Sequence, residues 1–374
     1  MRERNNTFTV LSAIAIILIL LGHMDFQVLT LGGLFPYYSY HVMIFVFISG
    51  YFYKRSDEED VLHYLLKRFR RLMIPYFLWN VIYGVICMLL KKAGINVGED
   101  ISLYNLILAP FIGGHQFGLN APAWFVPALF LLQTCDIFAR KIWNTVSEKL
   151  LGKRKDKIGE WMLMLLYLMV GMAVVALAKR GSVYDWYKLP GRLMLMAPAY
   201  QFGRLYHEDI EKRDTIPSII YFPVLILINL ILTYIYVGLG YSTVWVTGFS
   251  GSIITPFITT FTGIAFWLRV SRVIASKLDL NSLTSKAVFS IHDHTYDIMM
   301  HHLAVFMIIK AVLYLMFSAG ICNDMDITAF RNDIYYTYVP GAIEGFKWVY
   351  LILGCALPVM AGVLTGRVRK KIGK

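Results

Sequence analysis

Three ionisable side chains stand at the ends of two apolar runs near the N-terminus: His23, Asp25 and His41. Imidazole and carboxylate groups are costly beside apolar runs of this kind unless they line a polar cavity, so they mark a functional site. An imidazole in a partly dry cavity can take a proton from an attacking alcohol, which makes His23 the candidate general base. The competing interpretation is structural, because interfacial histidines among tyrosines such as those before His41 often bond only to a neighbouring carbonyl.

Arg68 and Arg71 form a second candidate site, within the basic stretch from Lys67 to Arg71. A spacing of three places the two guanidinium groups one helical turn apart on one face. That arrangement suits phosphate oxygens, such as those of coenzyme A or of a lipid headgroup. Anchoring of a basic segment at the membrane surface would explain the same cluster without any bound ligand.

A third cluster occupies residues 292–302 (HDHTYDIMMHH), which hold four of the nine histidines. On a helix His294, Asp297 and His301 would share a face, which is acceptable geometry for a metal such as zinc. A wet vestibule or a proton relay accounts for the same residues. Because no cysteine or glutamate completes a ligand shell, we expect no metal.

The composition describes a membrane protein. Of 374 residues, 57% are hydrophobic and 16% charged, and the mean hydropathy is +0.58, values that a soluble surface does not produce. The net charge of +12 does not indicate nucleic acid, because the basic residues fall in short clusters between apolar runs, as membrane topology requires. The four cysteines, Cys87, Cys135, Cys322 and Cys355, indicate neither a disulfide framework nor a metal site.

Ten apolar runs are long enough to cross ~30 Å of hydrocarbon at ~1.5 Å per residue: 8–28, 35–53, 73–91, 122–139, 159–179, 190–206, 217–237, 251–269, 294–317 and 345–366. Most basic residues then fall in the even-numbered loops and the C-terminal tail, so both termini are predicted to be cytoplasmic. We expect an all-α, polytopic helical bundle in the cell membrane, with residues 1–374 forming one domain.

Two further segments are too polar or too short to span. The stretch Ile101 to Ile112 contains Pro110 and precedes two glycines, which predicts a re-entrant or surface segment. The segment 318–343 would lie outside the membrane and is rich in tyrosine and aspartate. It would form either a lid or acceptor-binding surface, or an ordinary connecting loop.

Five stretches taken in order resemble the integral-membrane acyltransferases of family 3 over most of the chain: Leu20 to His23, Tyr40 to Lys54, Lys67 to Trp79, Pro122 to Phe130 and Thr295 to His302. The resemblance implies transfer of an acyl group, often acetyl from cytoplasmic acetyl-CoA, to a hydroxyl of an extracytoplasmic sugar, glycan or glycolipid. His23 resembles the essential first-span histidine of the family. Arg68 and Arg71 resemble its Arg-x-x-Arg motif, which would hold coenzyme A.

We expect His41, Asp25, Trp124 and His302 to bind substrate around that histidine. At Ser12 the chain departs from the family, many members of which carry arginine eleven residues before the histidine. Ser12 on the His23 face is also the candidate nucleophile for an acyl-enzyme route, which competes with direct transfer.

A transporter or flippase for a polar or lipid-linked substrate is the alternative function, with the same histidines lining its path. Such proteins often contain inverted repeats, and none is evident here. A non-catalytic scaffold would explain the apolar runs but not the placement of His23, Asp25 and His41.

Overall fold

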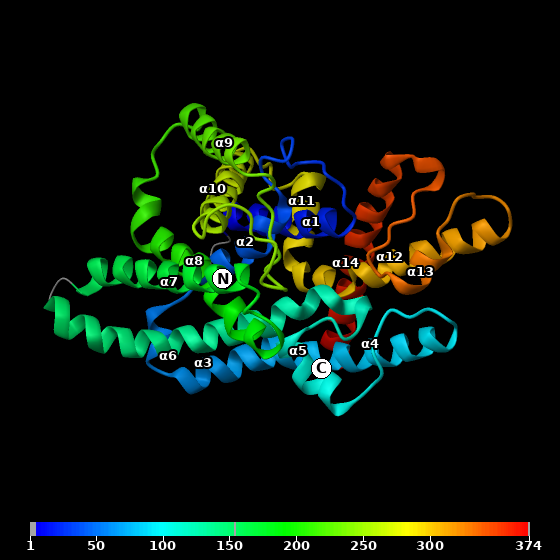
Figure 1. Cartoon of the computed structure of the whole chain (residues 1–374), viewed down its shortest axis with the longest axis horizontal. Helices are drawn as coiled ribbons and strands as arrows, with labels where there is room; N and C mark the ends of the chain where they lie inside the picture. The colour runs from blue at the N-terminus through cyan, green and yellow to red at the C-terminus, as the bar shows by residue number, and fades with distance from the viewer. Residues whose placement is uncertain (1–4, 153–154, 373–374) are drawn as a thin grey trace.

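The computed structural model describes residues 5–152 and 155–372, and its regular elements are helices (Figure 1). The α-helices are α1 (Asn6–His23), α2 (His41–Tyr51), α3 (Val61–Arg68), α4 (Ile74–Lys92), α5 (Ala109–Ile112), α6 (Phe125–Leu151), α7 (Lys155–Lys179), α8 (Lys188–Leu205), α9 (Ser218–Ile235), α10 (Thr255–Ser276), α11 (Leu283–Asp293), α12 (Thr295–Ser318), α13 (Ile327–Asn332) and α14 (Lys347–Ile372).

Eight helical segments among the described residues are long and apolar enough to cross a membrane. They confirm the predicted all-α polytopic bundle and comprise α1, α3 continued into α4, α6, α7, α9, α10, α12 and α14. The segment Ile101 to Ile112 becomes a π-helical turn, Tyr104–Leu108, followed by the four-residue α5. It is far too short to cross, as expected.

Two of the ten predicted spans, 35–53 and 190–206, are not among these eight segments. Helix α2 has 11 residues and most of them are buried, while α8 has 18 residues that include three basic side chains. The two helices cross at very close range, since a Cβ atom added to Gly50 would lie 1.9 Å from the carbonyl oxygen of Tyr200. One added to Gly203 would lie 2.0 Å from that of Phe47. Other helices, rather than lipid, therefore cover much of their apolar surface.

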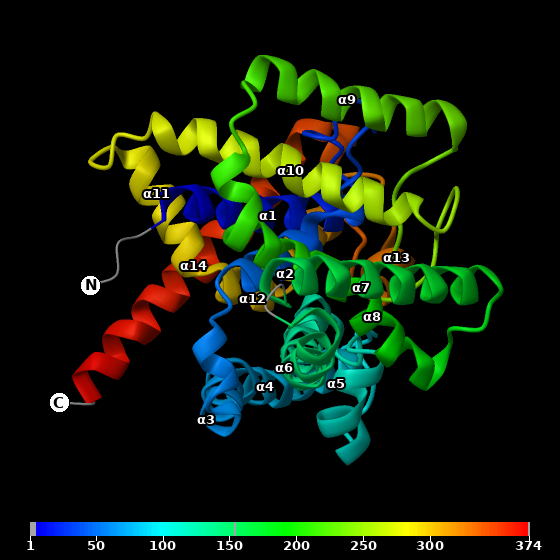
Figure 2. The ribbon, with the colours of Figure 1, turned by 90° about the vertical axis from the view of Figure 1, so that its left-hand side faces the viewer.

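Helix α1 lies at the centre of the bundle and α9 at its edge (Figure 2). In the apolar window of α1, 72% of residues are buried, compared with 11% in α9. A helix that is apolar on every side can face either lipid or other helices, and α1 packs against α2, α10, α11, α12 and α14. This central position surrounds residues 8–22 of α1 with protein and places His23, its last residue, among neighbouring helices.

Candidate active site

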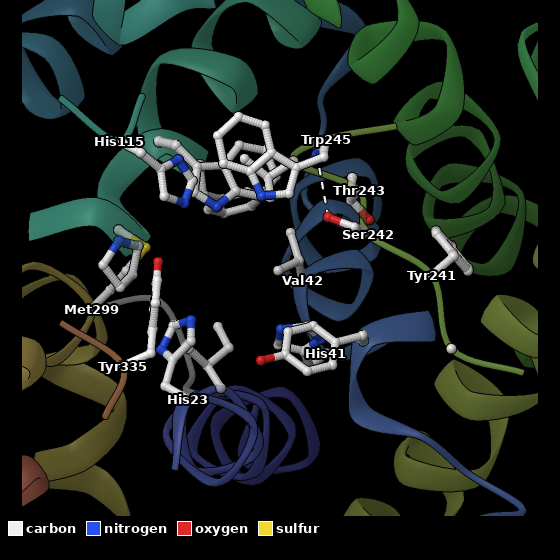
Figure 3. A pocket seen from close by; sticks show the side chains of 17 residues that line it. His23, His41, Val42, His115, Tyr241, Ser242, Thr243, Trp245, Met299 and Tyr335 are labelled. Atoms are coloured by element: carbon white, nitrogen blue, oxygen red, sulfur yellow. Dashed lines mark hydrogen bonds between the residues drawn. The ribbon is translucent and has the colours of Figure 1, made fainter. Parts of the chain in front are cut away.

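A cavity of about 440 Å³ surrounds the end of α1, and we call it the histidine cavity (Figure 3). Three imidazoles, those of His23, His41 and His115, contribute to its wall, together with aromatic rings that include Trp124, Trp245 and Tyr335. In Figure 3 His23 and Tyr335 lie across the cavity from His115 and Trp245. The structure thus brings three of the residues expected from the sequence, His23, His41 and Trp124, into one wall.

His302 lies behind His23 and is fully buried. The Nδ1 atom of His302 is 2.8 Å from the carbonyl oxygen of Ile298, which can only accept, so in the neutral ring Nδ1 carries the proton. The Nε2 atom of His302 is then the acceptor for Nδ1 of His23, 2.8 Å away. In neutral His23 this leaves Nε2 unprotonated, which is the nitrogen a general base requires.

His302 was expected to bind substrate, but it has no place in the wall of the histidine cavity. Its ring stacks on that of His23 with 5.0 Å between the ring centroids. The position of His302 suits orientation of His23, in the way that a second group orients a catalytic histidine in many hydrolases.

The two other imidazoles of the cavity are also held by backbone carbonyls. Nδ1 of His41 lies 2.5 Å from the carbonyl oxygen of Tyr37, and Nδ1 of His115 lies 3.2 Å from that of Gly113. Burial lowers the pKa of His115 to about 4, so this ring is neutral at pH 7. The wall opposite His23 therefore offers an uncharged imidazole beside Trp245, whose ring centroid is 4.8 Å away.

A second cavity, of about 590 Å³, contains both members of the predicted arginine motif, and we call it the arginine cavity. Arg68 ends α3, and Arg71 lies in a π-helical turn, Phe69–Met73, that joins α3 to α4. Such turns are frequent at functional sites. No ion pair joins either guanidinium to a carboxylate in residues 5–152 and 155–372. Both arginines are therefore available to an anionic ligand.

The two cavities meet at Phe125 and Met299, which line both of them. Helix α1 also passes from one to the other, with Ile16 in the wall of the arginine cavity and Ile19 in that of the histidine cavity. Phe125 begins α6 and Met299 lies in the second turn of α12. Helices α1, α6 and α12 thus form a common wall running from the arginines to His23.

Asp25 lies outside the histidine cavity. It is exposed and lines a third cavity, of about 340 Å³, together with Lys347 and Thr337. His23, Tyr38 and Tyr335 line this third cavity too, so His23 can be approached from two sides.

The 292–302 cluster is divided among several contacts. Nδ1 of His294 pairs with a carboxylate oxygen of Asp297 at 2.8 Å, whereas Nδ1 of His301 lies 2.7 Å from the hydroxyl of Tyr83. In the described chain no three His, Cys, Asp or Glu side chains are grouped so that they could hold a metal ion. His292 contacts the hydroxyl of Ser12 at the position where the family often has arginine.

Three further residues help to position the site, and the sequence had drawn attention only to Lys310, as an ionisable group within an apolar run. Tyr335 lies in the predicted outer segment, its ring 5.5 Å from that of His23. Buried Lys310 donates to the carbonyl of Ile334 at 2.9 Å and so fastens that segment beside His23. Arg192 of α8 is buried and donates to the carbonyls of Val244 and Gly113, joining two loops of the cavity wall.

His115 was not singled out from the sequence either, and its signal lay only in the character of its segment. Irregular backbone at membrane depth is tolerated where it lines a cavity or is buried in protein. The stretch after α5 fits that rule, because Gly114 has φ +75° and an added Cβ there would lie 2.4 Å from Cβ of Trp124. This turn brings His115 into the cavity wall.

Comparison with known families identifies the family of the chain. A family model described as an acyltransferase domain matches residues 5–330, which confirms the resemblance carried by the five sequence stretches. Neither a curated protein nor a solved structure matches the chain. The chain therefore belongs to acyltransferase family 3, as a multi-pass membrane acyltransferase.

Proposed function

We propose that this protein is an O-acyltransferase that moves an acyl group, most simply acetyl, from cytoplasmic acyl-CoA to a hydroxyl of an extracytoplasmic sugar, glycan or glycolipid. The observation that carries the proposal is the meeting of the two cavities at Phe125 and Met299. One cavity offers unpaired cations for a phosphorylated donor and the other offers a base for an alcohol. Both chain termini would face the cytoplasm, as the basic loops predict.

The donor would enter through the arginine cavity. Arg68 and Arg71 would bind the phosphates of the acyl-CoA, since guanidinium groups bind phosphate oxygens strongly. The acyl end would extend along α6 and α12 to Met299, where the arginine cavity borders that of His23. No metal is needed for this chemistry.

The acceptor would enter the histidine cavity from outside. Its aromatic wall suits the apolar faces of a sugar ring, and Nε2 of His23 would take the proton of the reacting hydroxyl. The alcohol oxygen then attacks the thioester carbon, the C–S bond breaks, and the thiolate of coenzyme A leaves. The proton on His23 passes to that thiolate, so the products are an O-acyl ester and free coenzyme A.

Tyr335 is placed to assist this step. In Figure 3 its hydroxyl points toward Met299, where the thioester would arrive. A tyrosine hydroxyl is protonated at pH 7, so that of Tyr335 can donate a hydrogen bond. A fixed donor at this point would stabilise the negative charge that develops on the thioester oxygen.

The test compares the parent protein with His23→Ala and with His63→Ala, an exposed histidine that lines neither cavity. Purified protein in lipid nanodiscs is incubated with acetyl-CoA and extracted envelope glycans, and free thiol is measured. We expect His23→Ala to lower acceptor-dependent thiol release by about 10²-fold or more, the usual share of a general base. His63→Ala should behave as the parent does.

Equal thiol release by His23→Ala would exclude the general base. In sealed proteoliposomes, movement of a glycan substrate across the membrane without thiol release would favour the transporter hypothesis instead.

A further inference from the structure

Gln133 has a buried amide without a partner. Only 1% of the residue is exposed, and neither its side-chain oxygen nor its nitrogen has a hydrogen-bond partner among the described residues. Leaving both halves of a buried carboxamide unsatisfied is unfavourable and calls for an explanation, such as a ligand that completes the bonds. The proposed chemistry at His23 does not use Gln133.

Gln133 lines the arginine cavity, on the face of α6 that leads toward His23. Phe125, Leu129 and Gln133 follow one another at intervals of four residues, so they share one side of the helix, and all three line this cavity. Eight residues of helix span ~12 Å at ~1.5 Å per residue. Gln133 therefore lies about that far along the wall from Phe125, where the arginine cavity meets the histidine cavity.

The side chain of Gln133 matches one part of the donor in chemistry. Between its diphosphate and its thiol, coenzyme A carries a pantetheine arm that contains two amide groups. A carboxamide can donate to one amide oxygen and accept from one amide N–H at the same time. The phosphates at Arg68 and Arg71 and the thioester at Met299 would leave this arm lying along the same wall.

We infer that Gln133 binds the pantetheine arm of the donor through its amide groups. The assignment rests on the proposed use of acyl-CoA. It makes the middle of the donor, and not only its phosphates, a recognition element, so that amide-containing thioesters of the pantetheine class are preferred. Turning of the Gln133 amide toward the ligand would satisfy both of its unpaired atoms.

The experiment compares coenzyme A with a ligand that keeps the adenosine, its 3′ phosphate and one 5′ phosphate but lacks the second 5′ phosphate and the pantetheine arm. Binding of coenzyme A and of 3′,5′-adenosine diphosphate to the full chain in nanodiscs is measured by equilibrium dialysis for the parent and for Gln133→Leu. We expect Gln133→Leu to weaken coenzyme A binding roughly five- to tenfold, the effect of one or two lost hydrogen bonds. Binding of the adenosine diphosphate should not change.

Two other variants complete the test. Thr134→Val alters the next residue of α6, whose hydroxyl bonds only within its own helix, and should bind both ligands as the parent does. Gln133→Asn keeps the amide but shortens its reach, and serves if the leucine variant does not fold; it should also weaken coenzyme A binding.

Unchanged coenzyme A binding in the Gln133 variants, or an equal loss of both ligands, would overturn this assignment and leave the proposed function intact. Failure of the parent to bind coenzyme A would remove the proposed function, and this assignment with it.

Discussion

His302 lies outside the histidine cavity, yet it determines which nitrogen of His23 is free. Its own Nδ1 is committed to the carbonyl of Ile298, and its Nε2 therefore accepts from His23. A carbonyl, rather than a carboxylate, ends this chain of bonds. In the proposed reaction, the proton taken from the acceptor would therefore place a positive charge on a pair whose chain of bonds contains no carboxylate.

This arrangement predicts a graded response at position 302. His302→Leu removes the acceptor for His23 and frees its ring to rotate or change tautomer, so turnover should fall roughly 10- to 100-fold, less than the 10²–10⁴ contributed by a base itself. His302→Gln supplies an amide oxygen that can still accept, and should recover part of the loss. Thiol release measures turnover, and coenzyme A binding should be unchanged in both variants.

Equal activity in the leucine and glutamine variants would show that the bond to His23 does not matter. A loss of coenzyme A binding in either would indicate a general defect of folding.

The sequence identified candidate residues of the site better than it identified the side chains to which they are hydrogen-bonded. His23, His41 and the arginine pair were identifiable because ionisable groups stand out beside apolar runs. The choice of His302 over His301 as the partner of His23 depends on helix rotation, since adjacent residues differ by about 100° around the axis. It depends also on packing between helices far apart in the chain, for which no local pattern gives evidence.

At the scale of elements, the crossing of α2 and α8 holds in place the part of the histidine cavity wall formed by His41 and Val42 of α2. Gly203→Ala would push a methyl group against the backbone of α2, within 2.0 Å of the carbonyl oxygen of Phe47. Backbone cannot turn aside as a side chain can, so we expect destabilisation of at least roughly 1–3 kcal/mol, as for an overpacked core. A lower midpoint of thermal unfolding in detergent would measure it.

Gly345→Ala is the matched control, because an added Cβ there meets nothing within 4 Å. An unchanged midpoint for Gly203→Ala would mean that α2 and α8 can separate enough to accept a methyl group at no cost in stability.

The same crossing explains why ten spans were predicted where eight segments satisfy length and composition. An apolar run such as 35–53 indicates that its side chains are shielded from water, but either lipid or other helices can shield them. Residues of α2 are covered by neighbouring helices, so the helix can be short. The fold class followed from composition and from the length of the apolar runs, whereas the difference between a lipid-facing and a protein-covered helix could be learned only from the packing.

For the whole molecule, the proposed function requires the two cavities to communicate at Phe125 and Met299, which line both of them. Met299→Trp should fill that junction, leaving coenzyme A bound at the arginines while lowering transfer by roughly 10²-fold, the cost of misplacing reactants by about 1 Å. Met299→Leu conserves volume and should retain most activity. Coenzyme A binding and thiol release, measured on both variants, separate donor binding from transfer.

Full activity of the tryptophan variant would mean that donor and base do not meet at this junction. Loss of coenzyme A binding would show instead that Met299 supports the donor site as a whole.

The pairing of His23 with His302 can form only late in synthesis. The two residues are separated by 279 positions in the chain, and at about 5–20 residues per second the ribosome needs roughly 15–60 s to pass from one to the other. The candidate base emerges almost first, and the group that orients it emerges only when four-fifths of the protein has been made. A nascent chain stalled before α12 would therefore be inserted in the membrane yet catalytically silent.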